Sequence, residues 1–163
     1  MERIDADDLP GRACAAAAAL DVVGDRWTML VVREVMLGNH RFSDIARFTG
    51  APRDRLAARL TRLVDAGVLE RRQYQDNPPR SDYHLTASGR GLLPVLEALR
   101  QWGDRWAVQA PPARAEHTGA GHELHEVVGQ WRCRTCGDTI GTGDYRLVRT
   151  GADDVPLDAE ARQ

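Results

Sequence analysis

The sequence predicts a mainly α-helical fold with a small β-hairpin, followed by a small β-rich module near the C-terminus. Residues 41–72 hold two short amphipathic segments in close succession and then an extended stretch. A turn-forming stretch at 76–79 separates two segments of alternating polarity, which predicts a hairpin. Helix, tight turn, helix and hairpin in this order are typical of a helix-turn-helix that carries a wing.

Two helices are expected before this central unit. Residues 12–23 are rich in alanine and therefore have a strong helix propensity. After Gly24, Asp25 is expected to cap a helix that runs to Leu37, because a carboxylate can accept from the unpaired N–H groups of a first turn. Apolar side chains cover more than half of this second helix, so we expect it to be buried on most sides.

The first helix of the central pair is expected to be capped by Ser43 and to end at Gly50. The second helix follows Pro52, and its leucines recur at spacings of four and three, which places them on one face. The leucines are Leu56, Leu60 and Leu63, and the arginines off their face are Arg53, Arg55, Arg59 and Arg62. One side is therefore expected to pack and the other to be cationic. Gly67 is expected to end this helix before a strand that starts at Val68.

The predicted hairpin carries Arg80 at its tip. Thr86 is then expected to cap a long helix over residues 87–108, which has a wide apolar stripe of leucine and tryptophan. Pro94 lies inside this segment and predicts either a bend or a later start of the helix.

These elements predict five segments along the chain. They are an N-terminal arm at 1–11, a winged helix-turn-helix domain with flanking helices at 12–108, a linker at 109–121, a small β-rich, zinc-ribbon-like module at 122–150, and a disordered tail at 151–163.

The formal net charge of −2 is unevenly distributed. Residues 25–90 carry a net charge of +4, whereas residues 1–24 and 107–163 carry −3 each. Because counter-ion release depends on the local cationic face, the basic middle is compatible with binding to nucleic acid. The alternative is that these arginines only form a solvated surface.

Other protein classes receive little support. No apolar run approaches the ~20 residues that a membrane-spanning helix needs, and the N-terminus is acidic where a secretory signal is basic. We therefore expect a cytoplasmic protein without a membrane partner. The chain has no phosphate-binding loop, nucleophile elbow or evident pair of catalytic carboxylates, so we do not expect an enzyme.

Several motifs occur together in the order that is known from one family. They are C-A-A-A-A-A-L-D-V-V-G-D-R-W from Cys14 to Trp27, R-F-S-D-I at 41–45, L-x-x-R-L-x-x-L-x-x-A-G-V-L from Leu56 to Leu69, Y-H-L-T-x-x-G at 83–89 and L-L-P-V-L at 92–96. Across residues 12–106 the chain resembles the HxlR-type family of bacterial winged helix-turn-helix transcription regulators. The resemblance implies a homodimer in which the first helix and the helix after the wing contact the partner. Two-fold symmetry then predicts a palindromic operator of double-stranded DNA.

The expected DNA contacts lie mainly on the second helix of the central pair. They are Arg53, Asp54, Arg55, Ala58, Arg59 and Arg62 on that helix, Arg80 in the wing, and Arg41 on the DNA backbone. An arginine that donates two hydrogen bonds to guanine gives ~1–3 kcal/mol of discrimination, whereas one on a phosphate adds affinity alone. Alternatively, Arg59 and Arg62 pair with acids of their own helix, and Arg41 ties its helix to a neighbour. Pro52 departs from the family, in which serine often caps this helix, so its first residue is open by one position.

Two features suggest a regulatory input. Cys14 occupies the position at which some members of this family resemble thiol-based sensors, and an activated thiol needs a lowered pKa. The alternative is that Cys14 is a small packing residue in an alanine-rich helix. Trp102 and Trp106 could line a cavity for a small aromatic effector, or they could form the core of an interface.

The C-x-x-C pair of Cys133 and Cys136 has the shape of a zinc knuckle. A structural zinc ion needs four ligands, and His122 and His125 could supply the other two. The connection between His125 and Cys133 is short, so a ribbon without metal is an equal alternative. A dithiol redox pair is a third.

Together these patterns predict a homodimeric, sequence-specific transcription regulator. We expect a repressor whose DNA occupancy responds to a small molecule or to thiol oxidation. A redox- or zinc-handling protein that acts through the C-x-x-C module, and a winged-helix adaptor between proteins, are the alternative hypotheses.

Overall fold

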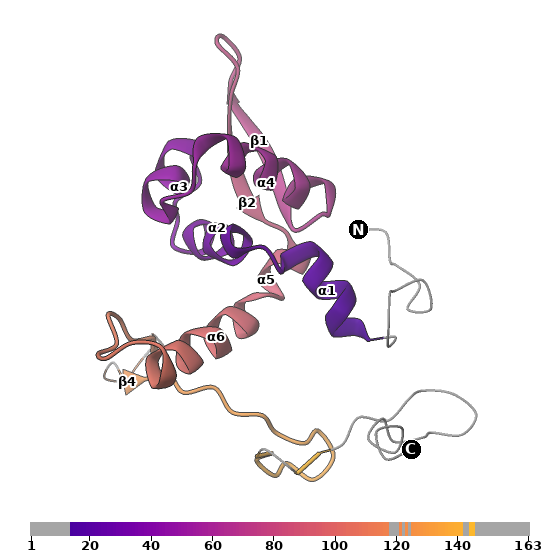
Figure 1. Ribbon diagram of the computed structural model, residues 1–163, viewed down its shortest axis with the longest axis vertical. Helices are drawn as coiled ribbons and strands as arrows, with labels where there is room; N and C mark the ends of the chain where they lie inside the picture. Colours follow the sequence, from indigo (N-terminus) through magenta and orange to yellow (C-terminus); the bar gives the residue numbers. More distant parts are fainter. Residues whose placement is uncertain (1–13, 118–120, 122, 124, 142–143, 146–163) are drawn as a thin grey trace, which may run out of the picture. The chain divides into compact units, whose positions relative to one another are not determined.

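The computed structural model describes residues 14–117, 121, 123, 125–141 and 144–145, and the chain divides into two compact units, residues 1–108 and 109–163. The elements of the first unit are α1 (Ala15–Val23), α2 (Arg26–Met36), α3 (Phe42–Thr49), α4 (Arg53–Asp65), β1 (Leu69–Gln75), β2 (Arg80–Leu85), α5 (Ala87–Arg90) and α6 (Leu93–Trp106) (Figure 1). The mainly helical architecture with one hairpin is as predicted. The predicted arm and tail lie outside the described residues.

The helix α2 has a side-chain cap at its N-terminus, whereas α3 has none. Asp25 caps α2 as predicted, because its side chain accepts from the backbone N–H of Trp27 at 2.8 Å. The predicted cap at Ser43 is wrong. The Arg41 carbonyl already accepts from the N–H of Ile45 at 3.0 Å, so Arg41 is the capping position and Ser43 lies inside the first turn.

The helix α4 begins directly after a proline. Pro52 is extended, with ψ of 139°, and its carbonyl accepts from the N–H of Leu56 at 2.8 Å. Pro52 therefore occupies the N-cap position and Arg53 is the first helical residue. At the other end, Gly67 has a φ of 67°, which is costly for other residues and ends the helix where the sequence predicted.

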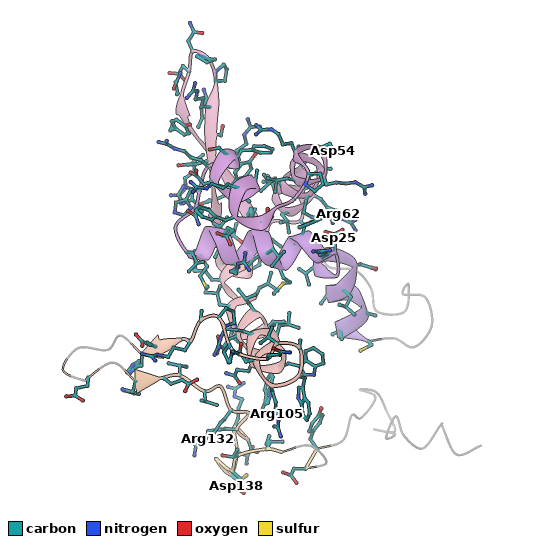
Figure 2. The ribbon with its side chains drawn as sticks, turned by 60° about the vertical axis from the view of Figure 1, so that its left-hand side comes forward. Asp25, Asp54, Arg62, Arg105, Arg132 and Asp138 are labelled. Carbon is teal, nitrogen blue, oxygen red and sulfur yellow. The ribbon has the colours of Figure 1, made fainter. Side chains whose placement is uncertain are left out.

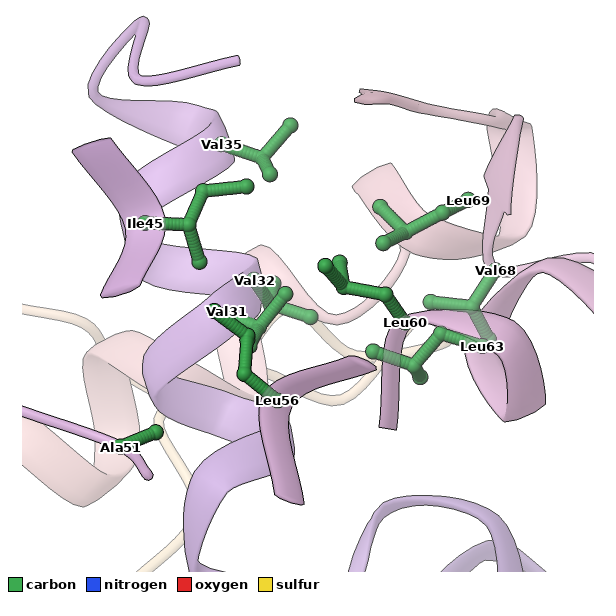
Figure 3. Close-up of a cluster of buried hydrophobic side chains, with 10 residues drawn as sticks. All are labelled: Val31, Val32, Val35, Ile45, Ala51, Leu56, Leu60, Leu63, Val68 and Leu69. Carbon is green, nitrogen blue, oxygen red and sulfur yellow. The ribbon is translucent and has the colours of Figure 1, made fainter. Parts of the chain in front are cut away.

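One hydrophobic core joins α2, α3, α4 and the start of β1. Its buried members are Val31, Val32, Val35, Ile45, Ala51, Leu56, Leu60, Leu63, Val68 and Leu69 (Figure 3). The three leucines of α4 are at most 1% exposed, and burial of each contributes roughly 1.5–3 kcal/mol relative to an exposed side chain. The leucine face thus fixes which side of α4 faces outward.

The hairpin pairs β1 and β2 in antiparallel register from Leu69 opposite Leu85 to Gln75 opposite Arg80, with an irregularity between Gln73 and Gln75. Its base is fastened to α5 by close backbone contact. A Cβ atom on Gly89 would lie only 2.3 Å from the carbonyl oxygen of Val68, so only glycine fits there.

The predicted long helix over 87–108 is divided into α5 and α6. Thr86 accepts from the N–H of Gly89 at 3.2 Å and so caps the short α5. Pro94 lies in the first turn of α6, where its missing N–H costs nothing. The later start that Pro94 predicted is therefore confirmed.

The second unit has short strands in its described part. β3 (Glu116–His117) pairs with β4 (His125–Glu126), and an isolated bridge joins Arg132 to Thr139. β3 falls inside the segment 109–121, which the sequence had suggested as a linker. Among the described helices of the chain, none is long and apolar enough to cross a membrane.

Candidate nucleic-acid interface

The outward side of α4 carries exposed, mostly cationic side chains. Arg53, Asp54, Arg55 and Ala58 are exposed because Leu56 and its equivalents turn the opposite face into the core. Within the described residues, the side chain of Arg55 makes no hydrogen bond or ion pair. The first turn and a half of α4 therefore offers donors to an external partner.

Two other arginines of α4 have partners within the protein. Arg59 forms an ion pair of 2.7 Å with Asp25, and its side chain is only 18% exposed. Arg62 donates to the backbone carbonyl of Asp21 at 2.7 Å. Figure 2 shows Arg62 on the side of α4 that faces Asp25 and the end of α1, whereas Asp54 lies away from this junction.

These contacts differ from the same-helix ion pairs that the sequence suggested as an alternative to DNA contact. The expected alternative partners were acids on α4 itself, but the observed partners belong to the α1–α2 junction. Arg59 and Arg62 thus tie α4 to the helices before it. Their DNA contacts stay predictions with less support than those of Arg53 and Arg55.

Arg41 and Arg80 both lie near the start of β2. Arg41 precedes α3 and forms an isolated antiparallel β-bridge with Asp82 of β2. Its backbone thus lies along the edge of the β1–β2 hairpin. Arg80 begins β2 beside the hairpin turn and is exposed. Arg71, which the sequence analysis did not select, is also exposed on β1. Its neighbour Arg72 is exposed as well but pairs with Glu70, so the sequence pattern of β1 does not distinguish the two arginines.

The helix α6 presents an apolar stripe that is exposed among the described residues of its unit. Val95, Leu99, Trp102 and Trp106 are 48, 52, 62 and 65% exposed. Their spacings of four, three and four place them on one helical face. In the isolated chain Trp102 and Trp106 therefore lie on an open surface.

The opposite side of α6 carries charged side chains that pair with one another. Arg100 donates to Glu97 at 2.9 Å and also pairs with Asp104. The hydrogen bond from Arg100 lowers the pKa of Glu97 below its usual value. Glu97 therefore stays ionised and paired at neutral pH.

Cys14 lies at the N-cap of α1 and is partly exposed. Its backbone carbonyl accepts from the N–H of Ala17 at 3.0 Å, and its thiol does not cap the helix. Arg12, two residues before Cys14 in the sequence, is a cation that could lower the pKa of a nearby thiol, but it lies outside the described residues.

The C-x-x-C pair lies in a tight hairpin. The N–H of Cys133 donates to Asp138 at 2.9 Å, and the N–H of Gly137 donates back to the Cys133 carbonyl at 2.9 Å. The backbone N–H groups of Cys136 and Thr135, with the Cys136 thiol, favour the Cys133 thiolate and lower its pKa to about 7. A cavity of about 600 Å³ lined by Trp131, Ile140, Gly141 and Tyr145 adjoins this hairpin.

The predicted zinc site is only partly described. His122 lies outside the described residues, and the ring of His125 contacts that of His117, with centroids 5.1 Å apart. Within the described part of the chain, no three His, Cys, Asp or Glu side chains gather as a metal site would require. Zinc binding by these four residues stays a prediction.

Because its pKa is lowered, Cys133 is expected to be alkylated at a lower pH than an ordinary cysteine. In chelator-treated protein, the rate of Cys133 modification by iodoacetamide should reach half its maximum near pH 7, because the thiolate is the reactive form and is lost as pH falls through the pKa. Peptide mass spectrometry over pH 5.5–9.5 separates Cys133 from the other cysteines. Cys136→Ala removes one donor and should move the midpoint upward. A midpoint near that of a free cysteine, at about pH 8.5, would contradict the hydrogen-bond geometry.

Comparison with known proteins agrees with this architecture. A family model for HxlR-like helix-turn-helix proteins matches residues 22–111. The HTH-type transcriptional regulator Rv3095 of Mycobacterium tuberculosis is 38% identical over 125 residues, which cover 75% of this chain and 77% of that protein. An HTH-type regulator of Synechocystis, sll1512, is 33% identical over 112 residues, 68% of this chain and 83% of its own length.

Solved structures show the same similarity. The crystal structure of PA1607, described as a candidate transcription factor, superposes with a TM-score of 0.71 at 34% identity and covers 84% of this chain and 95% of its own. The redox regulator HypR in its oxidised form has a TM-score of 0.52 at 30% identity, over 56% of this chain and 96% of HypR. The family model, the related sequences and the solved structures all indicate the same family. The chain belongs to the HxlR-like helix-turn-helix family of transcription regulators.

Proposed function

We propose that this regulator is a homodimeric repressor that binds a palindromic operator in double-stranded DNA. The observation that carries the proposal is the cationic outer side of α4, where Arg53 and Arg55 are exposed and Arg55 has no polar partner in the described residues. Residues at the N-terminal end of a recognition helix are those that reach base edges in the major groove. Asp54 and Ala58 share this exposed side and are proposed to lie against the bases.

The other exposed arginines are proposed to bind the DNA backbone. Arg41 lies before α3 and bridges to β2, and Arg71 and Arg80 lie in the hairpin that follows α4 in the chain. Phosphate contacts fix the orientation of the protein without reading the sequence. Binding by a chain of net charge −2 is consistent with this, because affinity depends on the cations at the interface.

The homodimer is proposed to form through α6, with α1 at the margin. The apolar stripe of α6 is large for a solvent-facing helix, and Leu20 of α1 is also 63% exposed. A two-fold axis through such a stripe lets each residue contact its own copy and presents two α4 helices to one operator. Half-sites about one helical turn apart are then expected.

Regulation is proposed to enter through α1 or α6. Cys14 begins α1, and the hydrogen bond from Arg62 to the Asp21 carbonyl connects the end of α1 to α4. Oxidation of Cys14 that shifted α1 would therefore act on α4 through a direct contact. A small aromatic effector stacked on Trp102 or Trp106 would act on the dimer instead.

A gel shift tests the central proposal. The full chain is titrated into a labelled duplex from the region upstream of its own gene and into a scrambled duplex, between 50 and 200 mM salt. Six to ten phosphate contacts per dimer should lower the affinity by roughly 10³–10⁵-fold over this range. Salt-independent binding, or equal affinity for both duplexes, would rule the proposal out. A reporter placed behind the bound region distinguishes repression from activation.

The second candidate is a redox-active or zinc-handling module in residues 122–150. The observation that favours it is the hairpin of Cys133 and Cys136, whose N–H groups and thiol donor favour a thiolate. Metal analysis of purified protein, followed by a thermal melt with and without a chelator, tests the zinc branch. Oxidation of the thiols followed by the same DNA titration tests whether the module affects the first function.

A further inference from the structure

The hairpin contains a β-bulge whose extra residue is aromatic. Gln73 lies opposite Ser81 and Gln75 opposite Arg80, so Tyr74 is an extra residue without a partner on β2. A bulge of this kind turns the extra side chain away from the regular alternation and is often found next to functional sites. Tyr74 is 46% exposed, which leaves much of its ring accessible.

The ring of Tyr74 lies against the side chain of Arg41. The Cζ atom of Arg41 is 5.4 Å from the ring centroid, within the ~6 Å range of a cation–π contact. Within the described residues, the guanidinium of Arg41 makes no hydrogen bond or ion pair. Tyr74 is thus what holds this charge in place.

A second arginine of the candidate interface also makes a cation–π contact with an aromatic ring. Arg53, the first residue of α4, lies 5.0 Å from the ring centroid of Phe42. Phe42 directly follows Arg41 in the chain, so two cations before and after α3 each rest on an aromatic ring from another element. A guanidinium stacked on a ring keeps its N–H edges free for a phosphate.

We propose that Tyr74 is a positioning residue for DNA binding, whose ring preorders Arg41 for contact with a backbone phosphate. The inference rests on the proposed function and deepens it. A free arginine loses rotamer freedom when it binds, and a side chain that is already ordered loses less. The expected contribution is roughly twofold to fivefold in Kd, the range for exposed cation–π contacts.

A competing role for Tyr74 is a direct hydrogen bond from its hydroxyl to DNA. The two roles are separated by substitution. Tyr74→Phe keeps the ring and removes the hydroxyl, whereas Tyr74→Leu removes the aromatic face and keeps an apolar side chain. Tyr74→Trp offers a stronger aromatic face and serves if the leucine variant does not fold.

The experiment measures Kd by fluorescence anisotropy for the full chain and its variants on the duplex that the wild type binds. Tyr74→Phe and Tyr74→Trp should stay within about 1.5-fold of wild type, and Tyr74→Leu should bind roughly twofold to fivefold more weakly. In the Arg41→Ala background, Tyr74→Leu should cause no further loss, because Tyr74 acts through Arg41. A thermal melt of each variant checks the fold.

Three results would overturn the inference. They are equal loss in the phenylalanine and leucine variants, an undiminished effect of Tyr74→Leu without Arg41, and wild-type affinity of Tyr74→Leu. Failure of the wild-type chain to bind any duplex would instead refute the proposed function, so the two failures are distinguishable.

Discussion

Replacing both Arg53 and Arg55 with alanine is expected to reduce the affinity for operator DNA by at least roughly a hundredfold, because each good arginine–guanine pair contributes ~1–3 kcal/mol. Both side chains are exposed at the start of α4, and the core face of the helix is formed by other residues. The substitutions should therefore lower the free energy of unfolding by no more than about 1 kcal/mol, mainly through loss of the contact between Arg53 and the ring of Phe42. Anisotropy titrations on specific and scrambled duplexes, with urea unfolding alongside, measure both quantities.

Two control variants separate loss of a DNA contact from loss of positive charge elsewhere and from loss of stability. Arg114→Ala removes an equally positive side chain from the second unit, where Arg114 is 71% exposed and pairs with Glu116, and should leave DNA binding unchanged. Arg59→Ala should mainly lower stability, because it breaks the ion pair with Asp25 that connects α4 to α2. Unchanged DNA binding by the Arg53 and Arg55 variant would favour the protein adaptor as the function of this helix.

The elements that the sequence predicted well are those determined by local periodicity. The leucine spacing of α4 located both its buried face and its end at Gly67, since glycine at a φ of 67° is a local requirement. Asp25 was identified as a cap because its acceptor role needs only the next two residues. Pro94 likewise located the start of α6 through its missing N–H.

The features that the sequence did not reveal depend on contacts between distant residues. Periodicity places Arg59 beside the leucine face, but it does not tell which neighbouring helix meets that flank. The same carboxylate of Asp25 that caps α2 also pairs with Arg59, and 34 positions separate the two residues. The bulge at Tyr74 was equally hidden, because no glycine marks it and the neighbouring glutamines fit a regular strand.

Replacing both Leu99 and Trp102 with glutamate is expected to convert the dimer into a monomer. The two side chains are 52% and 62% exposed and occupy the middle of the α6 stripe, where a two-fold axis would place them against their own copies. Four carboxylates would then be buried together at one interface, and each unpaired buried charge costs several kcal/mol. Sedimentation equilibrium and the DNA titration give the mass and the loss of affinity, which should be large because each half-site is then bound alone.

Leu37→Glu is the matched control, since Leu37 is another exposed leucine, 64% accessible, at the end of α2 outside the stripe. It introduces one carboxylate, half the charge of the double variant, into the same unit and should leave the dimer and its DNA affinity intact. A stable interface buries about 1,200–2,000 Å² in total, so loss of the central contacts on α6 is expected to separate the two chains. If the double variant remained dimeric, the dimer interface would have to lie away from α6. If the wild type were already monomeric, each chain would bind a single half-site, and the operator would not need to be a palindrome.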